Sequence, residues 1–310
     1  MTATRRADAS PPGGLFPFRA ERSFVHSTAA NAELALLLEV AGTPKPGNVD
    51  RERDLADLRF EQFLAGAVGA RPGLDACCDP NFPLGDGFER AVEGMAARSD
   101  TNTQFGALLV LAPLVRAAAT GECSRERVRD VVSATTVADA AGFYRAFDHV
   151  DVFVGDPPAD APDLDVRRGS DAVPAVQARD LTLADLMRDS ADRDGVAAEW
   201  SRGFERTFAA GDRIATTDGP LADRAADAFL ALLAAEPDTL VAEKHGDDVA
   251  REVTDRAADL HDATPGSAFD RDAVSAFAVD LVDRGINPGT TADLTAGALF
   301  VALERYGVDV

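Results

Sequence analysis

Four short polar segments interrupt a chain that is otherwise apolar and helical in pattern, and they hold the residue types that could do chemistry. The first is Thr43-Pro-Lys-Pro-Gly-Asn-Val-Asp50. Its prolines stiffen the loop, and Gly47 lets a ligand approach the backbone closely. Lys45 stands between the prolines, where a compact ammonium could meet a phosphate. Lys45 and Gly47 are therefore predicted to bind an anionic substrate.

The acids of the first segment could bind a divalent cation or move a proton. If a helix begins near Val49, Asp50 and Asp54 lie one turn apart, and Asp54 and Asp57 share a face. Mg²⁺ commonly takes one or two carboxylates plus phosphate oxygens, so Asp54 and Asp57 are predicted metal ligands. The alternative is that these acids only complement the dipole of a helix N-terminus.

The second segment, Ser99-Asp-Thr-Asn-Thr-Gln104, precedes an apolar helix. Asn102 and Thr103 could bind an anion or a sugar hydroxyl there, or they could simply cap the helix.

The third segment, residues 237–248, contains Lys244 beside His245. Lys244 is a candidate functional residue, whereas a lone histidine is more often structural.

The fourth segment, residues 284–293, contains Asn287, Gly289 and Asp293 directly before another apolar helix. Thr290 or Thr291 could cap that helix, with Asp293 completing a capping box. The same turn could instead bind a substrate, and we take Asn287 and Gly289 as predicted binding residues on that interpretation.

The charge of the chain excludes two classes of partner. Its 310 residues carry 31 Lys and Arg against 53 Asp and Glu, a formal net charge of −22. A nucleic-acid binder needs clustered Lys and Arg, and an anionic membrane surface attracts basic segments. Neither nucleic acid nor membrane is an expected partner, and a hydrophobic share of 46% excludes a disordered acidic protein.

The types of charged residue are biased as strongly as their number. Thirty-eight of the acids are Asp, and 29 of the 31 bases are Arg. This composition resembles that of proteins from salt-loving archaea, in which surface Asp is a solubility adaptation. Lys45 and Lys244 are the two lysines, and because every other basic residue is Arg, we consider them stronger candidates for functional residues.

Apolar spacing at three- and four-residue intervals predicts an all-α protein, a single bundle of about ten or more helices joined by Gly- and Pro-bearing loops; the family resemblance given below implies that these loops form a nucleotide pocket. We expect a mobile segment over residues 1–20 and one helical domain over residues 21–310, with a long loop at about 155–180. Helices are predicted to follow the first polar segment and to cover residues 23–40, 85–98, 102–119, 138–147, 182–193, 196–210, 219–235, 246–262, 269–284 and 291–306.

Cysteine usage and hydropathy bear on location. Cys77, Cys78 and Cys123 are too few and too badly spaced for a zinc site or a disulfide framework. Free thiols suit a reducing cytosol. The longest apolar run, residues 105–115, is shorter than the roughly 20 residues that a bilayer span requires. A cytoplasmic protein is therefore expected.

Taken together and in this order, the four segments resemble the triphosphoribosyl-dephospho-CoA synthase family, known from citrate lyase and malonate decarboxylase cofactor synthesis, in an archaeal-type branch. The resemblance covers about residues 25–306 and is carried by Leu37-Leu-Glu-Val-Ala-Gly-Thr-Pro-Lys-Pro-Gly-Asn-Val-Asp50, Thr101-Asn-Thr-Gln-Phe-Gly106, Asp238-Thr-Leu-Val-Ala-Glu-Lys-His-Gly246 and Asn287-Pro-Gly-Thr-Thr-Ala-Asp-Leu294.

The resemblance implies an all-α transferase that uses ATP and coenzyme-type acceptors. Such enzymes displace adenine from C1′ of the ATP ribose with the 2′-hydroxyl of 3′-dephospho-CoA, and Mg²⁺ is expected on the triphosphate. Lys45 and Lys244 would then contact the triphosphate. Asp50, Asp54 and Asp293 would supply the general base and a carboxylate near the developing cationic sugar.

Two alternatives follow from a departure within the second segment. Bacterial members carry His-Lys after the Asn-Thr pair, whereas Gln104 and Phe105 stand here. The chain could therefore transfer the same group to a different archaeal coenzyme precursor. It could also be a regulatory helical protein that binds ATP without turnover. Its oligomeric state is not readable from these residues.

Overall fold

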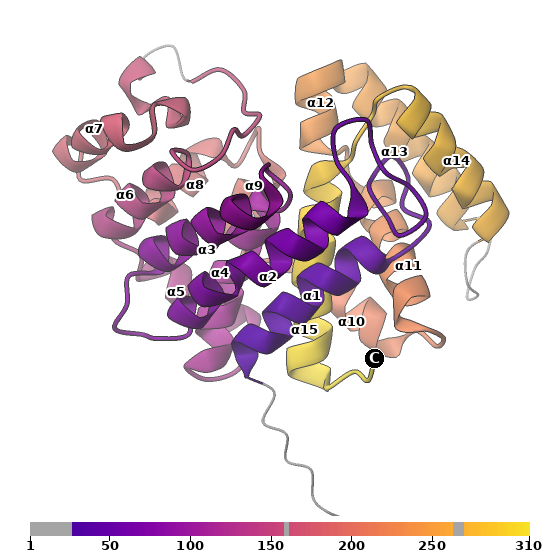
Figure 1. The fold of residues 1–310 in the computed structure, drawn as a ribbon, viewed down its shortest axis with the longest axis horizontal. Helices are drawn as coiled ribbons and strands as arrows, with labels where there is room; N and C mark the ends of the chain where they lie inside the picture. The colour runs from indigo at the N-terminus through magenta and orange to yellow at the C-terminus, as the bar shows by residue number, and fades with distance from the viewer. Residues whose placement is uncertain (1–26, 158–160, 263–269) are drawn as a thin grey trace, which may run out of the picture.

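The computed structural model describes residues 27–157, 161–262 and 270–310, and over these ranges every regular element is a helix, apart from an isolated bridge between Asp50 and Arg53. The all-α prediction is confirmed (Figure 1). Two short 3-10 helices, η1 and η2, lie at Pro162–Leu164 and Val166–Ala172. The α-helices are α1 Thr28–Ala41, α2 Phe60–Cys77, α3 Leu84–Ser99, α4 Phe105–Ala119, α5 Arg125–Ser133, α6 Val137–Ala146, α7 Val173–Ala178, α8 Leu183–Ser190, α9 Gly195–Arg202, α10 Glu205–Thr216, α11 Leu221–Ala235, α12 Thr239–His245, α13 Asp247–Asp262, α14 Arg271–Asp283 and α15 Gly289–Tyr306.

Two apolar helices, α4 and α15, form the centre of the main core. Every residue of α15 from Leu294 to Leu303 is buried, as the uninterrupted apolar pattern predicts. α15 contacts α1, α4, α10 and α11, and Figure 1 shows it running through the middle of the molecule. A second apolar cluster joins α11 to α13 and α14, which lie together at one side.

Several helix starts follow from the sequence. Ser124 caps α5, and Thr182 forms a capping box with Asp185 at the start of α8. Within the described ranges, no helix combines the length and the apolar character that a bilayer span would require. The expected mobile segment at residues 1–20 lies outside the described residues.

The predicted helix start near Val49 is wrong, because α2 begins only at Phe60. Residues 42–59 form a loop, in which the Asp50–Arg53 bridge and a bond from the Leu55 N–H to the Leu58 carbonyl replace helical hydrogen bonds. Asp54 and Asp57 therefore do not share a helical face, and Asp50 and Asp54 are not one turn apart.

Three other boundaries differ from the sequence-based expectation. The predicted helix at 196–210 is two helices, because Gly203 and Phe204 adopt φ of 69° and 57° and end α9 in a left-handed turn. The third polar segment contains a helix of its own, α12, capped by Asp238. The described part of the loop predicted at about 155–180 holds η1, η2 and α7.

Candidate active site

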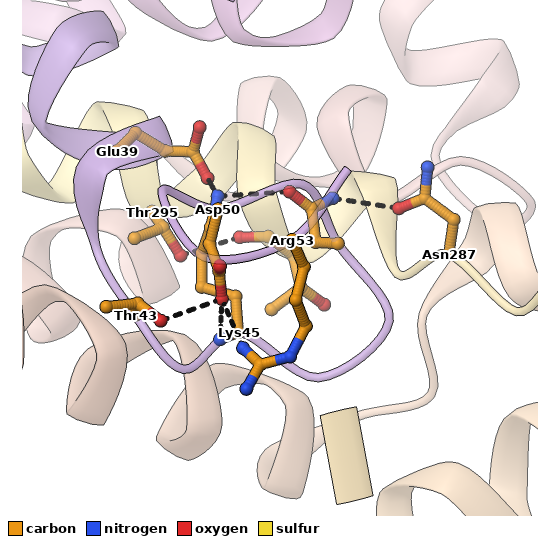
Figure 2. Close-up of polar contacts among 9 residues, drawn as sticks. Glu39, Thr43, Lys45, Asp50, Arg53, Asn287 and Thr295 are labelled. Atoms are coloured by element: carbon orange, nitrogen blue, oxygen red, sulfur yellow. Dashed lines mark hydrogen bonds and ion pairs between the residues drawn. The ribbon is translucent and has the colours of Figure 1, made fainter. Parts of the chain in front are cut away.

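Lys45 lies in the interior of the protein. Its side chain is fully buried, its Nζ forms an ion pair with Glu39 of α1, and the same Nζ donates to Asn48 Oδ1 at 3.0 Å (Figure 2). The ammonium also lies 6.0 Å from the centroid of the Phe229 ring. The positive charge of Lys45 is therefore compensated within the protein.

Asp50 holds the loop that contains Lys45. Its carboxylate accepts hydrogen bonds from the Thr43 hydroxyl at 2.9 Å, the Lys45 backbone N–H at 3.1 Å and the Arg53 guanidinium at 2.8 Å (Figure 2). A further bond comes from the Glu52 N–H at 2.8 Å. With four donors on one buried carboxylate, the local role of Asp50 is to fix the backbone around Lys45.

The first and fourth polar segments touch each other. Asn48 Nδ2 donates to Asn287 Oδ1 at 2.8 Å, and the Asn287 side chain appears beside the loop in Figure 2. Gly47 has φ of 71°, and a Cβ at this position would lie 2.2 Å from the Ile286 carbonyl oxygen. Glycine is required here because the two backbones approach so closely.

The second and fourth segments also meet. Asp293, in the first turn of α15, directs its carboxylate at the first turn of α4, where a Cβ on Gly106 would lie 2.0 Å from Asp293 Oδ2. Asn102 caps the same helix, since its Oδ1 accepts from the Phe105 N–H at 3.1 Å. The positive end of the α4 dipole thus faces the Asp293 carboxylate.

The third segment joins the fourth through Asp238. Its carboxylate accepts from the Thr291 N–H and the Thr291 hydroxyl, both at 2.7 Å, while also capping α12. Thr239 bridges two further helix starts: its hydroxyl lies 3.0 Å from the Thr290 hydroxyl and accepts from the Gly195 N–H at 3.0 Å. The N-termini of α9, α12 and α15 therefore converge.

A cavity of about 110 Å³ opens at this convergence. One part of its wall consists of the helix starts, and another carries the guanidinium groups of Arg202 and Arg206 beside Glu236. The residues that line the cavity include Asp194, Gly195, Arg202, Arg206, Glu236, Asp238, Thr239, Thr290 and Thr291.

Four carboxylates around this region repel one another. Burial, together with the charges of Glu39, Asp238 and Asp194, raises the pKa of Asp293 well above the ordinary carboxyl value. Burial is also the main cause that raises the pKa of Glu39, of Asp238 and of Asp194, although Lys45 opposes the effect at Glu39. A carboxyl group whose pKa is raised holds a proton more readily than an ordinary one and is suited to act as a general base or acid.

Asp293 and Asp194 differ from the other two acids in being accessible. Asp194 is exposed and Asp293 half-buried, although both stand among dense protein, whereas only 4% of Glu39 and 3% of Asp238 is exposed. Asp194 and Asp238 line the cavity, and Asp293 lies one turn or less beyond Thr290 and Thr291 of the same wall. Asp293 is therefore a half-buried predicted catalytic residue next to the cavity.

The remaining predicted site residues lie elsewhere or play visible structural roles. Asp54 and Asp57 are exposed on the loop before α2, and Asp54 Oδ1 accepts from the Phe60 N–H at 2.9 Å. Lys244 is exposed at the C-terminal end of α12, 4.8 Å from the centroid of the Phe153 ring. Thr103 faces Gly66 of α2, and its hydroxyl is buried without a hydrogen-bond partner in the described part of the chain.

Sequence reasoning missed Glu39, Asp194, Arg202 and Arg206 as members of the region. Glu39 gave a signal, because it is a single acid within the apolar run that ends α1. Asp194 looked like any helix cap. The two arginines gave none, since 29 arginines are spread through the chain and neither falls within a polar segment.

Gly289 completes the set of predicted residues. It is the first residue of α15, and a Cβ there would lie 2.6 Å from Leu240 Cδ2. Its small size thus allows α12 to pack against the start of α15. The structure brings Lys45, Gly47, Asn287, Gly289 and Asp293 into one region.

The molecule is thus an all-helical protein in which helix N-termini, acids and arginines line one cavity. Residues 26–309 match the family described as ATP:dephospho-CoA triphosphoribosyl transferase. The chain therefore belongs to that family and is a transferase, as the four polar segments indicated.

A solved structure supports the same assignment. A protein from Archaeoglobus fulgidus, provisionally assigned as a triphosphoribosyl-dephospho-CoA synthase, is similar with a TM-score of 0.64 and 25% sequence identity. The match covers 80% of this chain and 99% of that chain. No curated protein matches the sequence.

Proposed function

We propose that this protein transfers the triphosphoribosyl group of ATP to the 2′-hydroxyl of 3′-dephospho-CoA and releases adenine, with Asp293 as the general base. Membership of the family supports the reaction. The observation that supports the role of Asp293 is its half-buried carboxylate packed against the first turn of α4, whose pKa is raised well above the ordinary value by burial and by three neighbouring acids.

The reaction exchanges one bond at C1′ of the ribose for another. The bond from C1′ to the adenine nitrogen breaks, and a bond from C1′ to the acceptor oxygen forms. Asp293 takes the proton of the attacking hydroxyl, adenine leaves with the bonding electron pair, and the proton held by Asp293 then passes to adenine, directly or through solvent, which returns Asp293 to its ionised form. The sugar becomes cationic in the transition state, and the negative charge of the surrounding carboxylates stabilises it.

We further propose that Mg²⁺ accompanies the triphosphate. In the described ranges no three His, Cys, Asp or Glu side chains are grouped closely enough for an all-protein metal site. Mg²⁺ usually needs only one or two carboxylates with substrate phosphates, so the accessible Asp194 fits this requirement. When bound, the ion would neutralise phosphate charge. Asp54 and Asp57 remain the sequence-based alternative on the exposed loop.

The other predicted roles follow the same proposal. Lys45, Gly47, Asn48 and Asn287 hold the first segment against the fourth, and Asn102 and Thr103 set the start of α4. Lys244 is exposed and the Asp50 carboxylate is engaged by four donors, so we assign them to the outer surface and to the loop. Three free cysteines support a cytoplasmic location.

One assay tests the reaction. The purified full chain is incubated with ATP, Mg²⁺ and dephospho-CoA, adenine is followed by chromatography, and the nucleotide product is weighed by mass spectrometry. We expect adenine and a triphosphoribosylated acceptor in equal amounts. If adenine is released with another coenzyme precursor but not with dephospho-CoA, that precursor replaces dephospho-CoA as the proposed acceptor. Bound but unaltered ATP would identify a nucleotide-binding protein without turnover.

The Mg²⁺ assignment has its own comparison. Asp194→Asn keeps a good helix cap, because Asn caps helices as well as Asp does. We expect it to raise the Mg²⁺ concentration needed for half-maximal activity, whereas a variant carrying both Asp54→Asn and Asp57→Asn keeps the wild-type requirement. The reverse result would move the metal to the loop.

A further inference from the structure

One end of the cavity is basic, and the reaction proposed above does not use it. Arg202 is the last residue of α9 and Arg206 lies in the first turn of α10, so the break between these helices places two guanidinium groups side by side. Glu236 lies 3.8 Å from Arg202 Nη1 and 3.2 Å from Arg206 Nη1. One carboxylate thus faces two cations at the cavity wall.

Glu236 is poorly held in that place. It is the C-cap residue of the 15-residue helix α11, where the negative end of the helix dipole disfavours a carboxylate. Its side chain is 47% exposed, and the Arg202 side chain opposite it is 54% exposed. Exposed ion pairs of this kind contribute little stability, so a stronger anion can displace the carboxylate.

Arg206 is fixed in position and still has donors to offer. Its Nη2 donates to the Leu232 carbonyl at 3.2 Å, near the end of α11, and only 18% of its side chain is exposed. Its Nε is buried and has no hydrogen-bond partner among the described residues. A guanidinium anchored through Nη2, with an unpartnered Nε and with Nη1 facing an exposed carboxylate, suits a phosphate, which accepts two parallel hydrogen bonds.

We propose that Arg202 and Arg206 form a phosphate-binding site at this end of the cavity, which Glu236 occupies when no ligand is bound. The ligand chemistry is a polyphosphate chain. The inference rests on the proposed function, because the family's substrates supply two such groups, the triphosphate of ATP and the diphosphate of dephospho-CoA. It names the arginines, not the two lysines, as the cations that meet the phosphates.

The test measures binding and turnover separately. Tripolyphosphate is titrated calorimetrically into the wild-type chain, Arg202→Gln, Arg206→Gln, the double variant and Glu236→Gln. The control is Arg251→Gln: that side chain is 58% exposed and paired with Asp248 within α13, away from the cavity. We expect the double variant to bind tripolyphosphate roughly tenfold more weakly or worse, since each charge-assisted hydrogen bond contributes more than 1.4 kcal/mol. We expect Glu236→Gln to bind it more tightly.

Steady-state adenine release then identifies the substrate that uses the site. A raised KM for ATP with an unchanged KM for dephospho-CoA assigns the triphosphate, and the opposite pattern assigns the acceptor diphosphate. Wild-type affinity for tripolyphosphate and unchanged KM values in the double variant would overturn the inference. Wild-type binding of tripolyphosphate without adenine release would instead overturn the proposed function and leave the site standing.

A folding defect is separable from a binding defect. Arg206 anchors the end of α11, so its replacement could destabilise the protein, whereas Arg202 is exposed and its replacement leaves the core unchanged. If circular dichroism shows that Arg206→Gln melts at a lower temperature than the wild type, the binding test rests on Arg202→Glu alone. Its charge reversal is expected to abolish tripolyphosphate binding, and retained binding would contradict the proposal.

Discussion

Lys45 illustrates how the role of a residue can change once its neighbours are known. Its position between two prolines and its rarity among the bases favoured direct contact with a phosphate. In the fold, its ammonium is paired with Glu39 and Asn48 in the interior of the protein. Its rarity has a simple physical explanation, because an extended Lys side chain fits an interior slot that the wider Arg fork would overfill.

We expect Lys45→Met to lower the free energy of unfolding by about 3–5 kcal/mol, because it leaves Glu39 buried without a partner. The loss depends on pH. Burial already raises the pKa of Glu39 above 4.5, and removing Lys45 raises it further, so the folded variant favours the protonated acid. The variant should therefore approach wild-type stability below pH 4.5 and lose stability as the pH rises above that value.

Urea unfolding of the wild type and the variant across a pH series measures this effect. Adding Glu39→Gln to Lys45→Met should recover part of the loss, because the double variant buries no unpaired charge. Equal destabilisation at every pH, or no recovery in the double variant, would show that the pair does not stabilise the fold in this way.

The proposed role of Asp293 as general base can be tested by removing its charge. Asp293→Asn should lower turnover by roughly 10²–10⁴-fold while ATP still binds, because the base is lost and the shape is kept. In the wild type, the carboxylate must be ionised to accept a proton. Turnover should therefore rise with pH through a pKa well above that of an ordinary carboxyl group.

The measurement is a pH profile of adenine release, with ATP binding followed by calorimetry. Asp283→Asn at the exposed end of α14 is the matched control and should behave as the wild type. An acid limb at the ordinary carboxyl pKa would assign the base to a different group.

At the scale of helices, the contact between α4 and α15 positions Asp293. Gly106→Ala places a methyl group 2.0 Å from Asp293 Oδ2, so the carboxylate or the helix must move. We expect a stability loss of about 1–3 kcal/mol and a larger loss of turnover than stability alone explains. Gly121→Ala, whose Cβ would meet Arg127 Nε at 3.4 Å, is the control. Thermal melting and adenine release on both variants provide the comparison, and full turnover in Gly106→Ala would rule out this positioning role.

The helices themselves were largely predictable, and the breaks between them were not. Apolar periodicity located α3, α4, α11 and α15 because each buries one face or its whole surface in the core. The start of α2 was misplaced because the side chain of Asp50 takes up backbone donors that a helix would otherwise use. The split between α9 and α10 depends on Phe204 in a left-handed conformation, which its residue type does not favour.

The site was only partly predictable for a related reason. Residues within a polar segment stand out in sequence, so Asp293, Asn287 and Gly47 were found. Arg202 and Arg206 become neighbours of the third and fourth segments only through the packing of α9, α12 and α15. Spacing along the chain carries no information about that approach.

At the scale of the whole molecule, the net charge of −22 predicts a dependence on salt. Like charges on the surface repel one another, and added ions shorten the range of that repulsion from about 10 Å at 0.1 M to about 3 Å at 1 M. We expect the melting temperature to rise with KCl, as measured by circular dichroism between about 0.1 M and 2 M salt. Identical melting curves across this range would contradict the similarity to proteins of salt-loving archaea.

The central position of α15 has a consequence for how the molecule is made. This helix is synthesised after every other described helix, yet its Glu304 accepts hydrogen bonds from Thr28 and Asn31, residues separated from it by 276 and 273 positions. A nascent chain still lacking α15 has α1, α4 and α10 without the surface that they pack against, and it has no Asp293. The ribosome therefore releases a polypeptide whose core must close late, over long sequence distances, and slow folding with exposure to chaperones is the expected price of that topology.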